Sequence, residues 1–264
     1  MKITIMMATL NCYRNLSNFL ENLNYQTCRD FELVICDGGS TDGTVELLAH
    51  SKVVNYYVIH KTGIYEALNM LIGRISGDWV LVLGSDDSLH DFNTIRNITI
   101  ELQKLEGQIG LAYGDILIRN SNTSIIKKYP NINLFQQQYG KFPPFHHQSL
   151  LIRKSMLKDV GGFSIKFKVH ADYALFCEVL KRSHAKKINL VISNFSEGGT
   201  SGSVSKVFIS IGELIRIRKL YGENPFYGHW KFRFAIHLLH MSLKLILPTR
   251  FLNSIKTVYR SKLS

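Results

Sequence analysis

The sequence lacks the signatures of several large protein classes. Its four cysteines, Cys12, Cys28, Cys36 and Cys177, show neither metal-ligand spacing nor a disulfide framework, which favours reduced thiols in a cytosolic protein. We expect no secretory leader, because the strand-like run at Ile3 is not preceded by a signal-peptide pattern. No G-x-G-x-x-G follows that run and no Walker A sequence occurs, so a nicotinamide or flavin dinucleotide site is disfavoured.

Acidic residues are scarce in the last sixty residues. Residues 205–264 contain 11 Lys or Arg and 2 Asp or Glu, a balance of +9, whereas residues 1–204 contain 21 and 18, a balance of +3. This segment also lacks a membrane span, because its apolar run at 234–247 has fourteen residues and is interrupted by Lys244. A basic, aromatic-rich segment of this kind can lie in the membrane interface. We therefore predict a peripheral location on the inner face of the plasma membrane, with a helical hairpin packed on the main domain as the alternative.

The remaining composition indicates a globular protein. With 264 residues, 45% hydrophobic and 20% charged, the chain has room for one large α/β domain or for a domain with an appended tail. Strand-like apolar runs occupy residues 3–8, 31–36, 53–59 and 80–83, and helical spacing occupies 14–25, a segment from Thr44, and 64–72. This alternation predicts a Rossmann-like, mainly parallel sheet flanked by helices. In the less regular second half we expect strands at 109–113 continuing over 116–119, at 149–152 and at 188–192, and helices at 172–180 and 207–220.

Two adjacent carboxylates follow the apolar run at 79–84, in the sequence Ser85-Asp86-Asp87. Burying a carboxylate without a partner costs free energy, and ligands of open α/β sheets bind beyond the carboxyl ends of the strands. The pair therefore indicates a divalent ion that holds an anionic ligand, most simply a diphosphate. A solvated turn remains open on these residues alone, because Ser and Asp are common turn residues.

Several segments occur in a characteristic order along residues 1–204. They are Ala8-Thr9-Leu10-Asn11, Asp37-Gly38-Gly39-Ser40-Thr41-Asp42-Gly43-Thr44, Gly63-Ile64-Tyr65-Glu66-Ala67-Leu68-Asn69, Gly77-Asp78-Trp79-Val80, Ser85-Asp86-Asp87, His147-Gln148-Ser149, Gly161-Gly162-Phe163 and Ala171-Asp172-Tyr173. Together they resemble the family 2 glycosyltransferases with the GT-A fold, particularly the bacterial surface-polysaccharide branch. The resemblance implies a nucleotide-sugar-binding half at 1–115 and an acceptor and catalytic-base half at 116–204, with 205–264 as a basic helical extension.

The resemblance also implies an activity and the residues that carry it. The reaction would be an inverting, metal-dependent transfer of one sugar from a nucleoside diphosphate sugar, by default a UDP-sugar, to a lipid-linked glycan. Asp87 and Asp86 would bind Mn²⁺ or Mg²⁺, with Asp86 also near the ribose, and Asp172 would be the general base. The nucleotide sugar would further contact Ala8, Thr9, Asp37, Gly63 and Ser85, and His147 and Gln148 would lie on the acceptor side.

Other interpretations remain open on the residues alone. Asp37 also suits a turn, and Asp172 suits a helix amino terminus whatever its function. Relatives commonly carry an acidic residue where this chain has His60-Lys61-Thr62, and Glu66 stands where Asp is usual. The Gln-x-x-Arg-Trp motif of processive synthases is absent, which favours a non-processive hexosyl- or N-acetylhexosaminyltransferase. A sugar nucleotidyltransferase is the alternative enzyme, and a nucleic-acid-binding protein is suggested only by the charge, without a binding motif.

Overall fold

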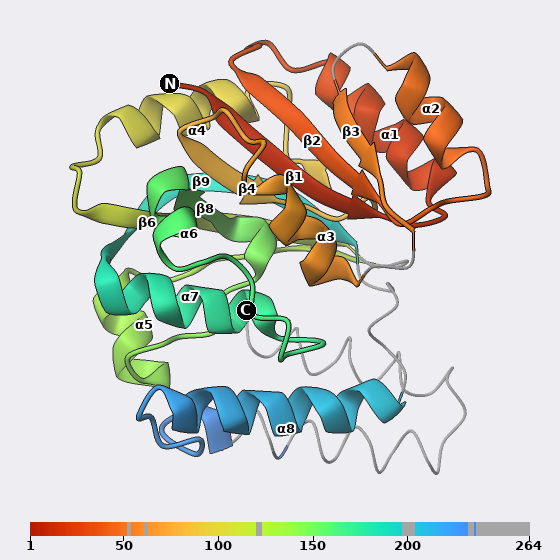
Figure 1. Ribbon diagram of the computed structural model, residues 1–264. Coiled ribbons are helices and arrows are strands. Elements are labelled where there is room, and N and C mark those ends of the chain that lie inside the picture. The colour runs from red at the N-terminus through yellow and green to blue at the C-terminus, as the bar shows by residue number, and fades with distance from the viewer. Residues whose placement is uncertain (52–53, 61–62, 120–122, 197–203, 232–234, 236–264) are drawn as a thin grey trace.

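The protein is built around one mixed sheet with helices on both faces (Figure 1). The computed structural model describes residues 1–51, 54–60, 63–119, 123–196, 204–231 and 235. The strand order is β3-β2-β1-β4-β8-β6-β9-β5, and β7 pairs with β6 outside this path. The α/β architecture expected from the sequence is therefore confirmed.

The elements follow one another closely along the chain. The strands are β1 (Ile3–Thr9), β2 (Phe31–Asp37), β3 (Val54–Val58), β4 (Trp79–Val82), β5 (Ser88–Leu89), β6 (Ile109–Arg119), β7 (Ser124–Lys127), β8 (Leu150–Arg153) and β9 (His184–Ser196). The helices are α1 (Tyr13–Asn24), α2 (Thr44–His50), α3 (Ile64–Leu71), α4 (Thr94–Gln103), α5 (Ile132–Tyr139), α6 (Lys154–Asp159), α7 (Ala171–Arg182) and α8 (Val204–Leu220), with a 3₁₀ turn η1 (His147–Ser149).

The first half of the sheet is parallel, and its strands β1, β2 and β4 are buried on both faces. β1 pairs in parallel with β2 and with β4, and β2 pairs in parallel with β3. Ile3, Ile5 and Met7 of β1 pack into the core below α1 and α4, whereas Met6 packs into the core that contains α3. Burial on both faces explains why β1 reads as a continuous apolar run without alternation.

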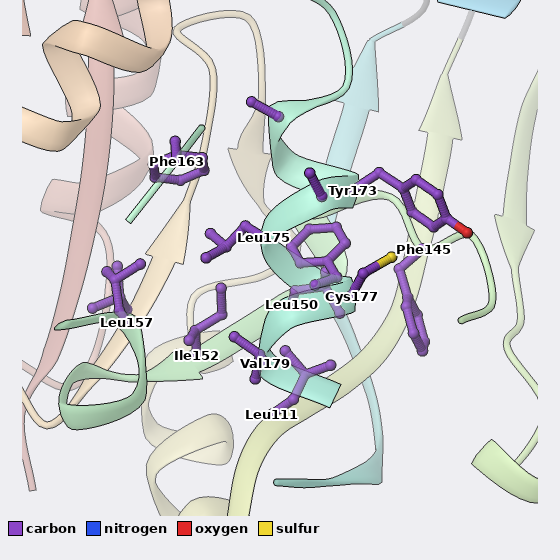
Figure 2. Close-up of a cluster of buried hydrophobic side chains, with 14 of the residues drawn as sticks. Leu111, Phe145, Leu150, Ile152, Leu157, Phe163, Tyr173, Leu175, Cys177 and Val179 are labelled. Atoms are coloured by element: carbon purple, nitrogen blue, oxygen red, sulfur yellow. The ribbon is translucent and has the colours of Figure 1, made fainter. Parts of the chain in front are cut away.

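The second half of the sheet is mixed. β8 runs antiparallel to both β4 and β6, while β6 and β9 are parallel with several register shifts. The mainly parallel arrangement expected from the sequence thus describes β3-β2-β1-β4. Helix α7 packs over β6 and β8, and Figure 2 shows Leu175 and Val179 of α7 together with Leu150 and Ile152 of β8.

The described part of the basic extension packs on the domain. Helix α8 covers the predicted helix at 207–220, and Figure 1 shows it running beside α7. Leu214, Ile217 and Trp230 belong to the same buried core as α7. No helix in the described parts of the chain is long and apolar enough to cross a membrane. The apolar run at 234–247 that was predicted to lie in the membrane interface falls almost entirely outside the described residues, as does Lys61.

Candidate functional site

The predicted nucleotide side of the site lies where the carboxyl ends of β1, β2 and β4 meet. Parallel pairing of β1 with both neighbours brings these three ends to one edge of the sheet. Thr9 at the end of β1 is in register with Asp37 at the end of β2. Ser85, Asp86 and Asp87 follow β4 by a short connection through Leu83 and Gly84.

Asp37 is fully buried and holds the loop that follows β2. Its Oδ1 accepts the backbone N–H groups of Gly39 at 2.9 Å and Ser40 at 2.7 Å, while its Oδ2 accepts the hydroxyls of Thr9 and Ser40, each at 2.7 Å. Gly39 adopts a φ of +92°, where a Cβ would collide with the His60 ring. The carboxylate therefore organises loop 38–40, and a ligand bond to Asp37 would have to replace one of these internal bonds.

The side chains of Asp86 and Asp87 both turn back toward Gly84. A Cβ placed on Gly84 would lie 2.7 Å from Asp86 Oδ1 and 3.2 Å from Asp87 Oδ2. Asp87 Oδ2 accepts the N–H of Gly84 at 2.8 Å, and the Asp87 side chain is only 4% exposed. The absence of a side chain at position 84 thus lets both carboxylates approach one point beyond β4.

The Asp87 carboxylate is buried and incompletely hydrogen-bonded. Its Oδ1 is buried without a hydrogen-bond partner among the described residues, although burial of an unpaired carboxylate oxygen is costly. Burial raises the pKa of Asp87 to about 6, and the neighbouring Asp86 charge acts in the same direction. In the described parts of the chain no cluster of three or more His, Cys, Asp or Glu side chains could hold a metal ion. Two carboxylates are still a suitable donor set, because Mg²⁺ usually takes one or two carboxylates together with substrate phosphates and water.

The predicted base lies at the start of α7 and faces η1. Asp172 is in the first turn of the helix, where the helix dipole favours a negative charge. Its Oδ2 lies 3.2 Å from Nδ1 of His147, and the two side chains are 21% and 35% exposed. Its Oδ1 accepts the N–H of Tyr173 at 2.8 Å. Asp172 and His147 therefore form a hydrogen-bonded pair that solvent and ligands can reach.

Charge interactions connect this pair to the carboxylates beyond β4. Burial opposes the charged forms of both groups, but the bond between them outweighs it. The pKa of His147 is raised above 6.5 and that of Asp172 is lowered below 3.8. The negative charges of Asp87 and Asp86 also raise the pKa of His147. The structure thus brings the predicted metal ligands, the histidine predicted on the acceptor side and the predicted base within range of one another's charges.

The other predicted residues take supporting places. Gln148 is buried beside Asp87, and its backbone carbonyl accepts the Ser193 hydroxyl at 2.8 Å. Ala8 packs against the core, and the hydroxyl of the next residue, Thr9, donates a hydrogen bond to Asp37. Gly63 is the N-cap of α3, and the Glu66 carboxylate folds back over it, so a side chain at position 63 would require Glu66 to move.

Three residues of this region were missed by sequence reasoning. Cys12 lies between the two predicted nucleotide loops, near Ser85 on one side and bonded through its N–H to the Thr44 hydroxyl on the other. Tyr65 and Glu213 both bind the backbone just ahead of Asp172. Tyr65 stood inside a recognised motif, but nothing in the sequence connects Glu213, 41 positions beyond Asp172, with the site.

Comparison with known proteins agrees with this fold. In solved structures the similarity extends to S. aureus TarS 1-349 in complex with UDP-GlcNAc, with a TM-score of 0.62, 16% identity, and coverage of 83% of this chain and 67% of that chain. It extends also to the mannosyltransferase PcManGT from Pyrobaculum calidifontis in complex with GDP-Man and Mn²⁺, with a TM-score of 0.64, 16% identity, and coverage of 100% and 81%. These similarities confirm the GT-A-like fold.

Relatives found by sequence similarity are also named as glycosyltransferases. A PGL/p-HBAD biosynthesis glycosyltransferase of Mycobacterium tuberculosis (strain ATCC 25177 / H37Ra) is 28% identical over 209 residues, which cover 76% of this chain and 79% of the relative. The putative glycosyltransferase EpsE of Bacillus subtilis (strain 168) is 23% identical over 172 residues, covering 61% and 60%. The family model for glycosyl transferase family 2 matches residues 4–161. The chain therefore belongs to glycosyl transferase family 2.

Proposed function

We propose that this protein is an inverting, metal-dependent and non-processive glycosyltransferase. It would move one hexose or N-acetylhexosamine from a nucleoside diphosphate sugar to a lipid-linked glycan in cell-surface polysaccharide biosynthesis. The observation that carries this proposal is the convergence of Asp87 and Asp86 with the His147–Asp172 pair, whose charges act on one another. One side of this centre suits a departing diphosphate, and the other suits an attacking hydroxyl.

The carboxylates beyond β4 suit the leaving-group side. Asp87 offers an unpartnered buried oxygen, and Asp86 is half-buried next to it. Mn²⁺ or Mg²⁺ bound there would stabilise the negative charge of the departing nucleoside diphosphate as a Lewis acid. Loop 38–40, Thr9, Ser85 and Gly63 would hold the nucleoside and the sugar at the same edge of the sheet.

Asp172 suits the acceptor side. In a direct displacement, the acceptor oxygen forms a bond to the anomeric carbon as the bond from that carbon to the diphosphate oxygen breaks. The hydroxyl proton passes to a carboxylate oxygen of Asp172. The Asp172–His147 bond fixes the direction of that carboxylate. A single displacement inverts the anomeric configuration.

The relatives support a role in surface glycans without fixing the sugar. Their names include PGL/p-HBAD biosynthesis, EpsE and a chondroitin synthase of Escherichia coli, of which this chain covers only 30%. One structural relative holds UDP-GlcNAc and another GDP-Man with Mn²⁺. A UDP-sugar remains the first donor to test, and GDP-mannose is the second.

The basic residues of the extension would attract an anionic acceptor or an anionic membrane surface. Arg216 and Lys219 of α8, together with Lys166, line a cavity of about 640 Å³ beside α7 whose floor includes Phe163 and Leu175. The lining also includes Glu178, so its three basic residues leave a net positive charge beside apolar walls, which would suit an amphiphilic anion. This arrangement supports the proposed placement at the inner face of the plasma membrane.

The proposed function is tested by a donor panel. We expect the melting temperature to rise with one of UDP-, GDP-, dTDP- or CMP-sugars only when Mn²⁺ or Mg²⁺ is present. Turnover should release a nucleoside diphosphate; release of pyrophosphate would instead establish the nucleotidyltransferase. Asp172→Asn should keep the donor-dependent shift and lose transfer by about 10²- to 10⁴-fold, the usual contribution of a general base. The exposed Asp159→Asn is the matched control, and an active Asp172→Asn variant would remove Asp172 from this role.

A further inference from the structure

The segment that leads into Asp172 is held by a carboxylate from the carboxyl-terminal helix. Glu213 of α8 accepts three consecutive backbone N–H groups. Its Oε1 binds Lys168 at 2.6 Å, and its Oε2 binds Val169 at 3.0 Å and His170 at 2.9 Å. His170 is the N-cap of α7, two residues before Asp172. Glu213 lies outside the stretch that matches the family model, residues 4–161.

A second bond on the same face of α8 strengthens this attachment. Ser210 lies one helical turn before Glu213, and its hydroxyl is 2.6 Å from Nε2 of His170. Leu214 and Ile217 on the inner face of α8 are buried in the core that also contains Ala171. The register of α8 against α7 is therefore fixed by packing as well as by hydrogen bonds.

The opposite side of the segment is held from the nucleotide half. The Tyr65 hydroxyl of α3 donates to the carbonyl oxygen of Val169 at 2.8 Å, and the Tyr65 ring stacks with Phe163 at 5.7 Å between centroids. Residues 168–170 thus lie between α3 and α8, with no helix or strand of their own. Loss of either attachment would free the backbone that sets the position of the first turn of α7.

We propose that Glu213 is a positioning residue for Asp172, acting through the backbone of residues 168–170. Charge-assisted hydrogen bonds to a carboxylate are short and directional, and three of them fix the residues that begin α7. The Asp172 carboxylate then meets His147 at 3.2 Å, with its remaining freedom limited to its own side-chain torsions. This inference rests on the proposed role of Asp172 as the base.

The test compares two isosteric variants of the extension. Glu213→Gln removes the charge and one acceptor oxygen from the bonds to residues 168–170. Glu223→Gln is the matched control, because Glu223 also ties the extension to the domain, through Lys141 N–H at 3.0 Å and Arg218 at 3.1 Å, but contacts no residue of segment 168–172 in the described structure. Ser210→Ala is a milder second variant that removes only the bond to His170.

Two measurements on the full chain decide the outcome. Hydrogen exchange of the amides at 168–170 should accelerate in Glu213→Gln and not in Glu223→Gln. With UDP-glucose, UDP-N-acetylglucosamine and GDP-mannose as donor probes and Mn²⁺ present, nucleoside diphosphate release should lose about tenfold or more in kcat in Glu213→Gln, because small misplacements of a reacting group are costly. The donor KM should stay within about twofold, and Ser210→Ala should show a smaller loss of kcat.

Three results would overturn the inference. They are unchanged exchange at 168–170 in Glu213→Gln, unchanged kcat in that variant, and an equal loss of kcat in Glu223→Gln, which would indicate only general loosening of the extension. Failure of the proposed function has a different signature. An active Asp172→Asn variant would remove the base, whereas an inactive one beside a fully active Glu213→Gln would remove only the positioning role.

Discussion

Burial of the Asp87 carboxylate disfavours its charged form when no cation is bound. Its side chain is 4% exposed with one oxygen unpartnered among the described residues, and burial raises its pKa to about 6. Because the folded state disfavours the charged form, the contribution of Asp87 to stability should be greatest below its ordinary pKa of 3.8 and be lost as the pH rises through 6. The cost at pH 8 is up to about 3 kcal/mol, at about 1.4 kcal/mol for each pKa unit.

Asp87→Asn should therefore separate stability from ligand binding. We expect the metal-free variant to melt at a higher temperature than the unmodified protein at pH 8, with the difference vanishing near pH 4. Stabilisation by Mn²⁺ with UDP should disappear in the same variant. The exposed Asp30→Asn serves as the control and should change neither measurement. Retention of the Mn²⁺-dependent shift in Asp87→Asn would exclude Asp87 as a ligand of the ion.

For individual residues, the sequence predicted which side chains lie together at the edge of the sheet but not which hydrogen bonds they form. The strand-end positions of Asp37 and Asp87 follow from apolar runs and parallel pairing, which local patterns reveal. The four internal bonds of Asp37 depend on the conformation of loop 38–40 and on Thr9 of another strand. Contacts such as that between Glu213 and residues 168–170 join distant segments, so no local pattern reports them.

Among the elements, the parallel strands are joined at the edge opposite the site by Glu32. This carboxylate of β2 accepts the Thr4 hydroxyl of β1 and the N–H groups of Ser76 and Gly77, which precede β4. Burial alone would raise the pKa of Glu32, but the bonds from Ser76, Thr4 and Gly77 lower it to about 2. The resulting stability is present above the ordinary pKa of 4.5 and is lost as the pH falls through 2.

Glu32→Gln should destabilise the sheet while sparing the site. We expect a loss of about 2 kcal/mol in the free energy of unfolding at pH 7, after allowance for solvent screening. The loss should shrink steadily below pH 4, as urea titrations at several pH values would show. Turnover of the folded variant should be unchanged, because Glu32 lies at the amino ends of the strands. Glu101→Gln, which removes only an exposed ion pair with Lys104, should cost far less.

Several elements were not predicted from the sequence, among them β5, β7, α4, α5 and α6, and for three of them the physical reason is clear. The two residues of β5 are too few to form a pattern, and β7 is a largely exposed strand that pairs only with β6. Helix α4 buries Ile95, Ile98 and Leu102 at helical spacing, but its several Thr and Ile residues also suit a strand. In contrast, β1, β2 and β4 each contain an apolar stretch long enough to indicate a strand from the local sequence alone.

For the molecule as a whole, the described part of the basic extension is built into the domain. Residues up to Trp230 belong to the domain, because Trp230 is fully buried and donates its indole N–H to the Tyr139 carbonyl at 2.7 Å. Its ring also stacks with Arg218, 4.5 Å from the guanidinium carbon. Removal of residues 205–264 would therefore expose core surface as well as remove charge, and any loss of membrane binding in such a truncation would be ambiguous.

A chain that ends at residue 235 tests the membrane proposal without this ambiguity. Residues 236–264 contain five Lys or Arg and no Asp or Glu, so their removal lowers the positive charge while Trp230 and α8 remain. We expect full-length protein to float with phosphatidylglycerol vesicles and not with phosphatidylcholine vesicles, and to be released by salt as the charges are screened. The shortened chain should keep its melting temperature within a few degrees and bind anionic vesicles at least about tenfold more weakly, since each basic residue near such a surface contributes about 1 kcal/mol. Equal binding of both chains would place the contact on α8 or the domain itself, and binding of neither would contradict the peripheral location.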